Sequence, residues 1–240
     1  MTDDGLVDQA RRFATEISQT VHALVPGCAP FTAEALGSRF TVEQSPATGI
    51  PLRVGGRPLL TLKIVFRCVS DSSGTYLAVE SSSLMVFEGP RAAGEPLFRY
   101  DYLRSPGSQI PGAHLQVHAH RDATTYAMTQ AGTSTPRGRR RAGSTAVPRL
   151  AELHFPLGGP RLRPCLEDLL EMLVSELGVD STPEGRQSLR EGRERWRRQQ
   201  VRAVVRDAPD EAVAILGELG YRVTPPVPPA TANVERLRAL

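Results

Sequence analysis

Aromatic residues and cysteines are both scarce in this chain, and each scarcity excludes one kind of structure. Aromatic residues make up 5% of the 240 residues, so the core must be built mainly from Leu, Val, Ile and Ala. The three cysteines, Cys28, Cys68 and Cys165, are far apart and show no C-x-x-C spacing. Neither a disulfide framework nor a thiolate zinc site is expected, and a reducing compartment such as the cytoplasm fits best.

Long apolar runs, export signals and common nucleotide-binding motifs are missing as well. The longest apolar stretch, Leu59–Val69, is interrupted by Lys63 and Arg67 and is shorter than the roughly 20 residues that span a bilayer. The acidic start, Met1 to Asp4, is unlike a secretory signal. There is no P-loop, no G-x-G-x-x-G, no H-E-x-x-H and no G-x-S-x-G. We therefore expect a cytoplasmic protein that does not span a membrane, and neither a P-loop enzyme nor a serine hydrolase of the usual fold.

The residues that are present predict an α+β fold, in which helices cover a central antiparallel sheet and a helical hairpin follows at the C-terminus. Apolar residues at steps of three and four predict a first helix from about Leu6 to Leu24. Residues 30–58 are rich in turn formers, and we expect one short strand there, near Arg39–Glu43. Alternating patterns and hairpin-length loops then predict an antiparallel meander of four strands: Leu59–Val69, Thr75–Glu88, Leu97–Leu103 and Ala113–His120.

The second half of the chain predicts mainly helices. Residues 129–148 have no apolar periodicity and indicate a mobile basic loop, followed by a short strand around Leu150–Phe155. A leucine-rich helix from Leu166 ends at Gly178. The expected division is a core domain over residues 1–180, a hairpin at one sheet edge over residues 181–222, and a proline-rich tail over residues 223–240.

Four segments together resemble a group of uncharacterised bacterial proteins that have no assigned activity. These segments are Leu97–Tyr102, Ala113–Asp122, Leu153–Glu167 and Glu191–Asp207, and the resemblance covers most of the chain. It implies a bacterial, cytoplasmic origin and carries no expectation about chemistry.

The strand from His114 to His120 gives the first hypothesis about a site. Because side chains alternate along a strand, His114, His118 and His120 share one face with Gln116. His118 and His120, together with His154 from a neighbouring strand, could hold a divalent metal and leave a position open for water. Without a metal, Asp101 could orient a histidine that acts as a general base. Solvated or mutually bonded histidines on a half-exposed sheet are the ordinary alternative, and the sequence favours that alternative over a metal.

The segment around His118 also resembles the first motif of the cupins. Gly112 is followed after five residues by His118 and then by His120, and Pro156-x-Gly158 is similar to the second cupin motif. Thr124 and Thr125 stand where the family has a glutamate, and Arg161 stands where it has a further histidine. Two of the expected metal ligands are therefore absent.

Arginine supplies the second hypothesis. Arginines account for 28 of the 29 basic residues, and they gather in residues 137–149 and 186–206, so the rest of the chain is acidic. A helical wheel of residues 186–206 turns Leu189 and Trp196 inward. The same wheel gives an outer stripe, and the loop adds a basic run; the candidate contacts are Arg195, Arg198, Arg202 and Arg206 with Arg139, Arg140 and Arg141. Such a surface can neutralise phosphates or an acidic protein, or it can remain solvated and paired along the helix.

We therefore expect a binding or regulatory module that engages nucleic acid, or an acidic protein partner, through the arginine-rich helix. The alternative is a small hydrolase or nuclease that uses the histidine-lined face, with or without a metal.

Overall fold

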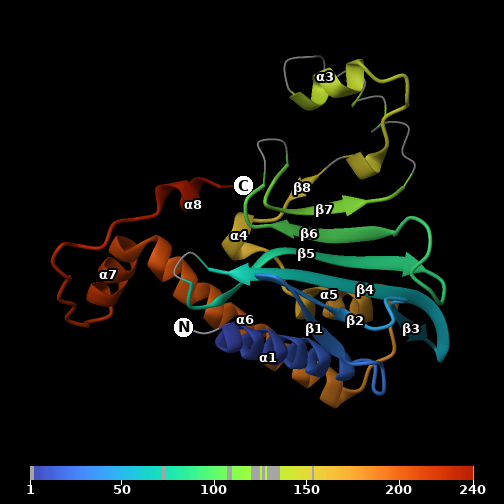
Figure 1. Ribbon diagram of the computed structural model, residues 1–240, viewed down its shortest axis with the longest axis horizontal. Coiled ribbons are helices and arrows are strands. Elements are labelled where there is room, and N and C mark those ends of the chain that lie inside the picture. The colour runs from blue at the N-terminus through green and yellow to red at the C-terminus, as the bar shows by residue number, and fades with distance from the viewer. Residues whose placement is uncertain are drawn as a thin grey trace.

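A computed structural model describes residues 3–71, 74–106, 110–119, 125, 128, 136–152 and 154–239. Its centre is an eight-stranded antiparallel sheet of order β1-β2-β4-β5-β6-β7-β8, with β3 pairing on β4 off this path (Figure 1). The strands are β1 (Phe31–Leu36), β2 (Arg39–Gln44), β3 (Ile50–Val54), β4 (Arg57–Ser70), β5 (Leu77–Glu88), β6 (Phe98–Leu103), β7 (Ala113–Val117) and β8 (Phe155–Pro156). The sequence prediction of an α+β fold with a central antiparallel sheet is confirmed.

Strand β4 is central to the sheet because it is long enough to pair with two strands along one edge. Residues 65–69 of β4 pair with β2, and residues 57–62 pair with β3. Its other edge pairs with β5 over nearly its whole length. The alternation expected from the sequence is present, since Leu62 and Cys68 are buried on one face while Arg67 is exposed on the other.

Three helices cover one face of the sheet: α1 (Asp3–His22), α5 (Leu166–Leu177) and α6 (Pro183–Asp207) (Figure 1). Leu170 and Leu173 of α5 are fully buried, and they share one hydrophobic core with Val21 of α1 and Leu189 of α6. Gly178 ends α5 with a φ of 67°, a conformation that glycine adopts without strain. The apolar residues that predicted these helices from their spacing are thus the residues that form the core.

Buried contacts between helices fix the position of α6. Glu167 of α5 accepts a hydrogen bond from Thr20 of α1 at 3.2 Å, and its carboxylate lies against Gly192 of α6. Near the start of α6, Gly185 lies so close to the carbonyl oxygen of Ala23 that a Cβ there would come nearer than 3.0 Å. The first half of α6 therefore belongs to the core, and its direction is set by α1 and α5.

Several expected elements differ from the structure. Residues 30–58 contain β1 and β3 in addition to the expected strand near Arg39–Glu43. The segment expected to be a loop contains the helix α3 (Pro136–Ala142). The strand expected around Leu150–Phe155 is a short 3-10 helix, Leu150–Glu152, followed by the two-residue strand β8, with α4 (Gly159–Leu162) close behind.

The C-terminal hairpin also lies elsewhere than expected. Helix α6 packs in the helical layer against α5 rather than at a sheet edge. Helix α7 (Pro209–Glu218) projects from its end, and the chain returns through α8 (Val234–Arg238) (Figure 1). No helix in the described part of the chain is both long and apolar enough to cross a lipid bilayer.

Candidate functional site

The register of the central strands brings three polar side chains into one row on the face opposite the covering helices. Ser83 of β5 pairs with Asp101 of β6, and Asp101 pairs with His114 of β7. The Ser83 hydroxyl donates a hydrogen bond to Oδ1 of Asp101. Oδ2 of the same carboxylate lies 2.9 Å from Nε of Arg99 and 3.7 Å from Nε2 of His114. The sequence left open which histidine would lie beside Asp101; in the structure it is His114, and Ser83 is a member of the row that the sequence did not indicate.

Gln116 connects this row to the segment that crosses it. Its Oε1 accepts a hydrogen bond from Nε of Arg99 at 2.5 Å, and its Nε2 donates to the carbonyl oxygen of Ala151 at 2.9 Å. The same Nε2 lies 2.8 Å from Nε2 of His154, whose Nδ1 donates to the carbonyl of Glu152. Satisfied polar networks of this kind hold buried segments in a single arrangement.

The row is largely closed to solvent. His114 is 2% exposed, its Nδ1 donates to the carbonyl oxygen of Pro111 at 2.9 Å, and its ring lies 4.5 Å from that of His154. A serine nucleophile needs hydrogen-bond contact with its base. Here the Ser83 hydroxyl donates to the carboxylate instead. These contacts tie β5, β6 and β7 together. A substrate would reach the row only after the segment that contains Ala151 and His154 moved.

The three histidines considered as metal ligands do not form one described cluster. His120 lies outside the described residues. Nδ1 of His118 lies 2.8 Å from Oε1 of Glu95, whereas His154 is bonded to Gln116. Within the part of the chain that the structure describes, no group of three His, Cys, Asp or Glu side chains could hold a metal ion.

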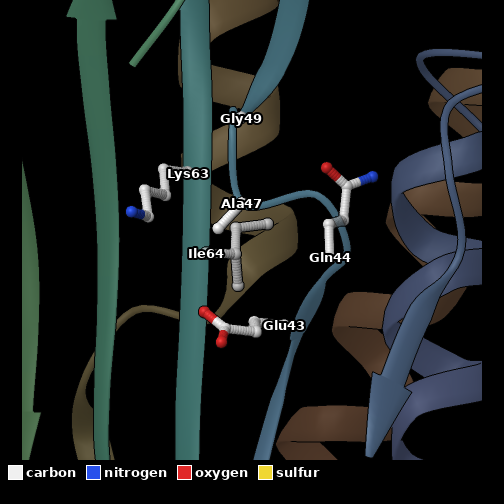
Figure 2. A pocket seen from close by; sticks show the side chains of 6 residues that line it. All are labelled: Glu43, Gln44, Ala47, Gly49, Lys63 and Ile64. Atoms are coloured by element: carbon white, nitrogen blue, oxygen red, sulfur yellow. The ribbon is translucent and has the colours of Figure 1, made fainter. Parts of the chain in front are cut away.

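Two hollows on the described surface lie away from the histidines. One, between β4 and the connection from β2 to β3, is shown in Figure 2, where Ile64 lies between Lys63 and Gln44. Its volume of about 10 Å³ leaves room for a single water molecule at most. The other is a shallow depression along the outer side of α1, near Arg12 and Glu16. Neither has the size and shape of an enclosed small-molecule site.

Of the eight arginines of α6, Arg186 and Arg190 are hydrogen-bonded to Ser181 and Gln187, and the other six fall into two groups, of which the first is neutralised within the chain. Nε of Arg193 lies 2.6 Å from Oδ1 of Asp168, and Nη2 of Arg197 lies 3.6 Å from the same oxygen. Burial opposes ionisation of Asp168, but hydrogen bonds from Cys165 and Arg193 outweigh it, so the pKa of Asp168 is lowered. These two arginines attach α6 to α5; Arg193 is largely buried, whereas the side chain of Arg197 is 65% exposed.

The second group is the arginine stripe, which we define as Arg195, Arg198, Arg202 and Arg206. All four side chains are exposed, and the stripe extends over about 16 Å of the distal half of α6. Arg198 is paired with Glu194 one turn away, at 2.7 Å. Arg195, Arg202 and Arg206 have no hydrogen-bond or ion-pair partner among the described residues. Arg195 does not pair with Glu191, which lies one turn before it and accepts a hydrogen bond from Gln187.

Trp196 lies beside the stripe and is half-buried as the wheel predicted. The guanidinium carbon of Arg163 lies 3.8 Å from the ring centre of Tyr102 and 5.8 Å from that of Trp196. Burial lowers the pKa of Arg163. This cation between two aromatic rings links the sheet to α6 and gave no signal in the sequence, since Arg163 lies in an irregular segment.

The basic run of α3 does not extend the stripe. Figure 1 shows α3 beyond β7 and α6 on the other side of the molecule, beneath the sheet. Arg139 and Arg140 are exposed, while Nε of Arg141 lies 3.9 Å from Oε2 of Glu152. The two basic segments lie apart, because the connection through the 3-10 helix Leu150–Glu152, β8 and α4 returns the chain beneath the sheet before α5 and α6 begin.

Comparisons with protein-family models, with curated proteins and with solved structures gave no significant match.

Proposed function

We propose that this protein is a nucleic-acid-binding module that contacts the phosphate backbone through the arginine stripe of α6. The observation that carries the proposal is the division among the arginines of one helix. Arg193 and Arg197 are paired with Asp168, whereas Arg195, Arg202 and Arg206 are exposed and have no ion-pair partner among the described residues.

The physical reason is that a row of cations displaces counterions from a polyanion. Three arginines on one side of a helix, within about 16 Å, can meet several successive phosphates of one strand or duplex. Guanidinium groups bind phosphate oxygens with two parallel hydrogen bonds, so arginine suits this role better than lysine does. Contacts of this type position a protein on nucleic acid without reading its sequence.

The test is a salt series on binding of a labelled duplex oligonucleotide, followed by fluorescence anisotropy with the full chain. If three arginines each neutralise one phosphate, the slope of log affinity against log salt should be about −2.7. Affinity should then fall roughly 40-fold between about 50 and 200 mM salt. The triple variant Arg195→Gln, Arg202→Gln, Arg206→Gln should lose most of the binding and nearly all of the salt dependence.

A second triple variant supplies the control, because it makes the same change in net charge elsewhere on the surface. Arg12, Arg57 and Arg91 are exposed and lie far from α6 in the sequence, and their replacement by Gln should leave affinity nearly unchanged. Failure of the unmodified chain to bind at low salt would remove the proposal, and so would equal losses in both triple variants. Equally tight binding of labelled polyglutamate would assign the stripe to an acidic protein partner instead.

A small hydrolase or nuclease is the second candidate function, and one contact favours it. Asp101 lies 3.7 Å from Nε2 of His114 on the polar face, so a carboxylate and an imidazole, the groups most used in general acid–base catalysis, are neighbours there. The 2% exposure of His114 argues against direct contact with substrate. Esterase and ribonuclease assays on the variants Asp101→Asn and His118→Ala, together with metal analysis of the purified chain, test this candidate. Any hydrolysis that continues unchanged in both variants does not come from this face.

A further inference from the structure

The C-terminal arm, which we define as residues 201–239, carries most of the large apolar side chains that are exposed among the described residues. Of the 18 large hydrophobic side chains that are exposed among the described residues, 11 lie in this arm. They are Val201, Val205, Val213, Ile215, Leu216, Leu219, Tyr221, Val223, Val227, Val234 and Leu237. A protein surface rarely gathers apolar side chains in this way unless a partner covers them.

Helix α7 is the centre of this surface. None of its ten residues is buried, and Figure 1 shows it projecting away from the sheet. The helical repeat places Ile215, Leu216 and the C-cap residue Leu219 on one side of α7. Ile215 is 53% exposed and Leu219 is 69% exposed. The side of α7 that would normally cover a core therefore faces solvent.

The charges around this apolar side indicate which partner fits. Asp210, Glu211 and Glu218 lie on α7, and Arg222 and Arg238 lie nearby in the sequence of the same arm. None of the five has an ion-pair partner among the described residues. Glu218 stands in the last turn of α7, where a negative charge opposes the helix dipole and gains most from a cation outside the chain.

An anionic membrane laid on α7 would match only the arginines of the arm and would be repelled by the acids of α7. A second copy of the chain carries both signs beside the same apolar side. In a two-fold pairing each residue contact occurs twice, so a surface with both signs and an apolar centre can be complementary to itself. A stable interface needs about 20–30 residues from each partner, and the arm supplies more than that.

We propose that the C-terminal arm is a self-association surface, on which the apolar side of α7 packs against the same side of a second copy while acids and arginines pair around it. The arm includes Arg202 and Arg206 of the arginine stripe, but the inference does not rest on the proposed nucleic-acid binding, because the contacts it proposes are made by α7, which carries no residue of the stripe.

Sedimentation velocity and light scattering on the full chain test the proposal across a range of protein concentrations. The unmodified chain should have the mass of a dimer. The variant Ile215→Glu, Leu219→Glu should have the mass of a monomer, with an unchanged helical signal and urea midpoint for the body. A matched control makes the same type of change at two exposed leucines outside the arm, Leu36→Glu and Leu162→Glu, and should remain dimeric.

Reversing the charges on α7 distinguishes binding of a second copy from binding of a membrane. The dimer of the variant Glu211→Arg, Glu218→Arg should have a dissociation constant at least tenfold higher than that of the unmodified dimer. A monomeric unmodified chain at high concentration overturns the proposal. It is overturned equally if charge reversal leaves the dimer unaffected and increases binding to vesicles of phosphatidylcholine and phosphatidylserine in equal parts, since the arm would then be a lipid-binding surface.

Discussion

The position of α6 on the body depends on one glycine, and replacing that glycine is a direct test of the packing that orients the arginine stripe. Gly185 is the third residue of α6, and a Cβ added there would come nearer than 3.0 Å to the carbonyl oxygen of Ala23. The oxygen belongs to the backbone, so it cannot turn aside as a flexible side chain would. The substitution Gly185→Ala must therefore shift α6 away from α1 or distort the turn that follows α1.

The expected cost follows from two opposing effects. Overpacking a well-filled contact costs about 1–3 kcal/mol, and a contact with backbone lies at the upper end of that range. Alanine is favoured over glycine in a helix interior by up to about 1 kcal/mol, and by less in the first turn. We expect Gly185→Ala to lower the free energy of unfolding by about 2 kcal/mol.

Gly5 provides a matched control, because it is also the third residue of its helix, α1, and a Cβ there would meet nothing within 4 Å. Gly5→Ala should raise the free energy of unfolding by about 0.4–1 kcal/mol. Urea unfolding followed by circular dichroism should then separate the two variants by roughly 1 M in midpoint. If both substitutions change stability in the same direction and by similar amounts, α6 does not lie against Ala23 as described.

Three further results are expected. The variant Asp168→Asn should lose about 2 kcal/mol at pH 7, the worth of a charge-assisted hydrogen bond. Because the pKa of Asp168 is lowered in the folded chain, its contribution is present above the unfolded pKa and is lost as pH falls through the folded value. The urea midpoints of the unmodified protein and the Asp168→Asn variant should therefore converge at acid pH, and a difference between the midpoints that stays constant with pH would contradict this. Burial raises the pKa of Cys68 to about 12 and that of Cys165 further, so a disulfide reagent should label half-buried Cys28 first, and equal labelling rates in the folded protein would be inconsistent with the structure. Leu170→Ala, at a fully buried site, should cost about 2–5 kcal/mol in the same unfolding assay, and a cost below 1 kcal/mol would remove this residue from the core.

Elements with strong periodicity could be predicted from the sequence. The spacing of apolar residues in α1 and α5 and the alternation in β4 gave the type, the approximate bounds and the buried side of each element. Gly178 as a stop and Pro209 as the break between α6 and α7 were also indicated by local chemistry alone. These signals lie within single elements and do not depend on distant partners.

Elements that depend on distant partners were missed. Strands β1 and β3 do alternate, but each has only five or six residues and lies among turn-forming residues, so the local pattern is short; they form by backbone hydrogen bonds to β2 and to the long strand β4. Helix α3 has the composition of a loop. For the candidate site, alternation along each strand could assign Asp101 and His114 to a face of the sheet. It could not give the strand register that brings Ser83 to the carboxylate of Asp101. Likewise, the sequence of α6 could not reveal that Asp168 neutralises Arg193, since that pair spans two helices.

The position of Trp196 has a practical consequence. It is the chain's single tryptophan, it is half-buried next to the stripe, and its ring lies close to the cation of Arg163. A nearby guanidinium alters the emission of an indole, so intrinsic fluorescence excited at the indole band reports almost solely on this junction between sheet and helix. Any ligand that bends α6 or draws Arg163 away would change the emission without a label, and an event confined to the far side of the molecule would leave it unchanged.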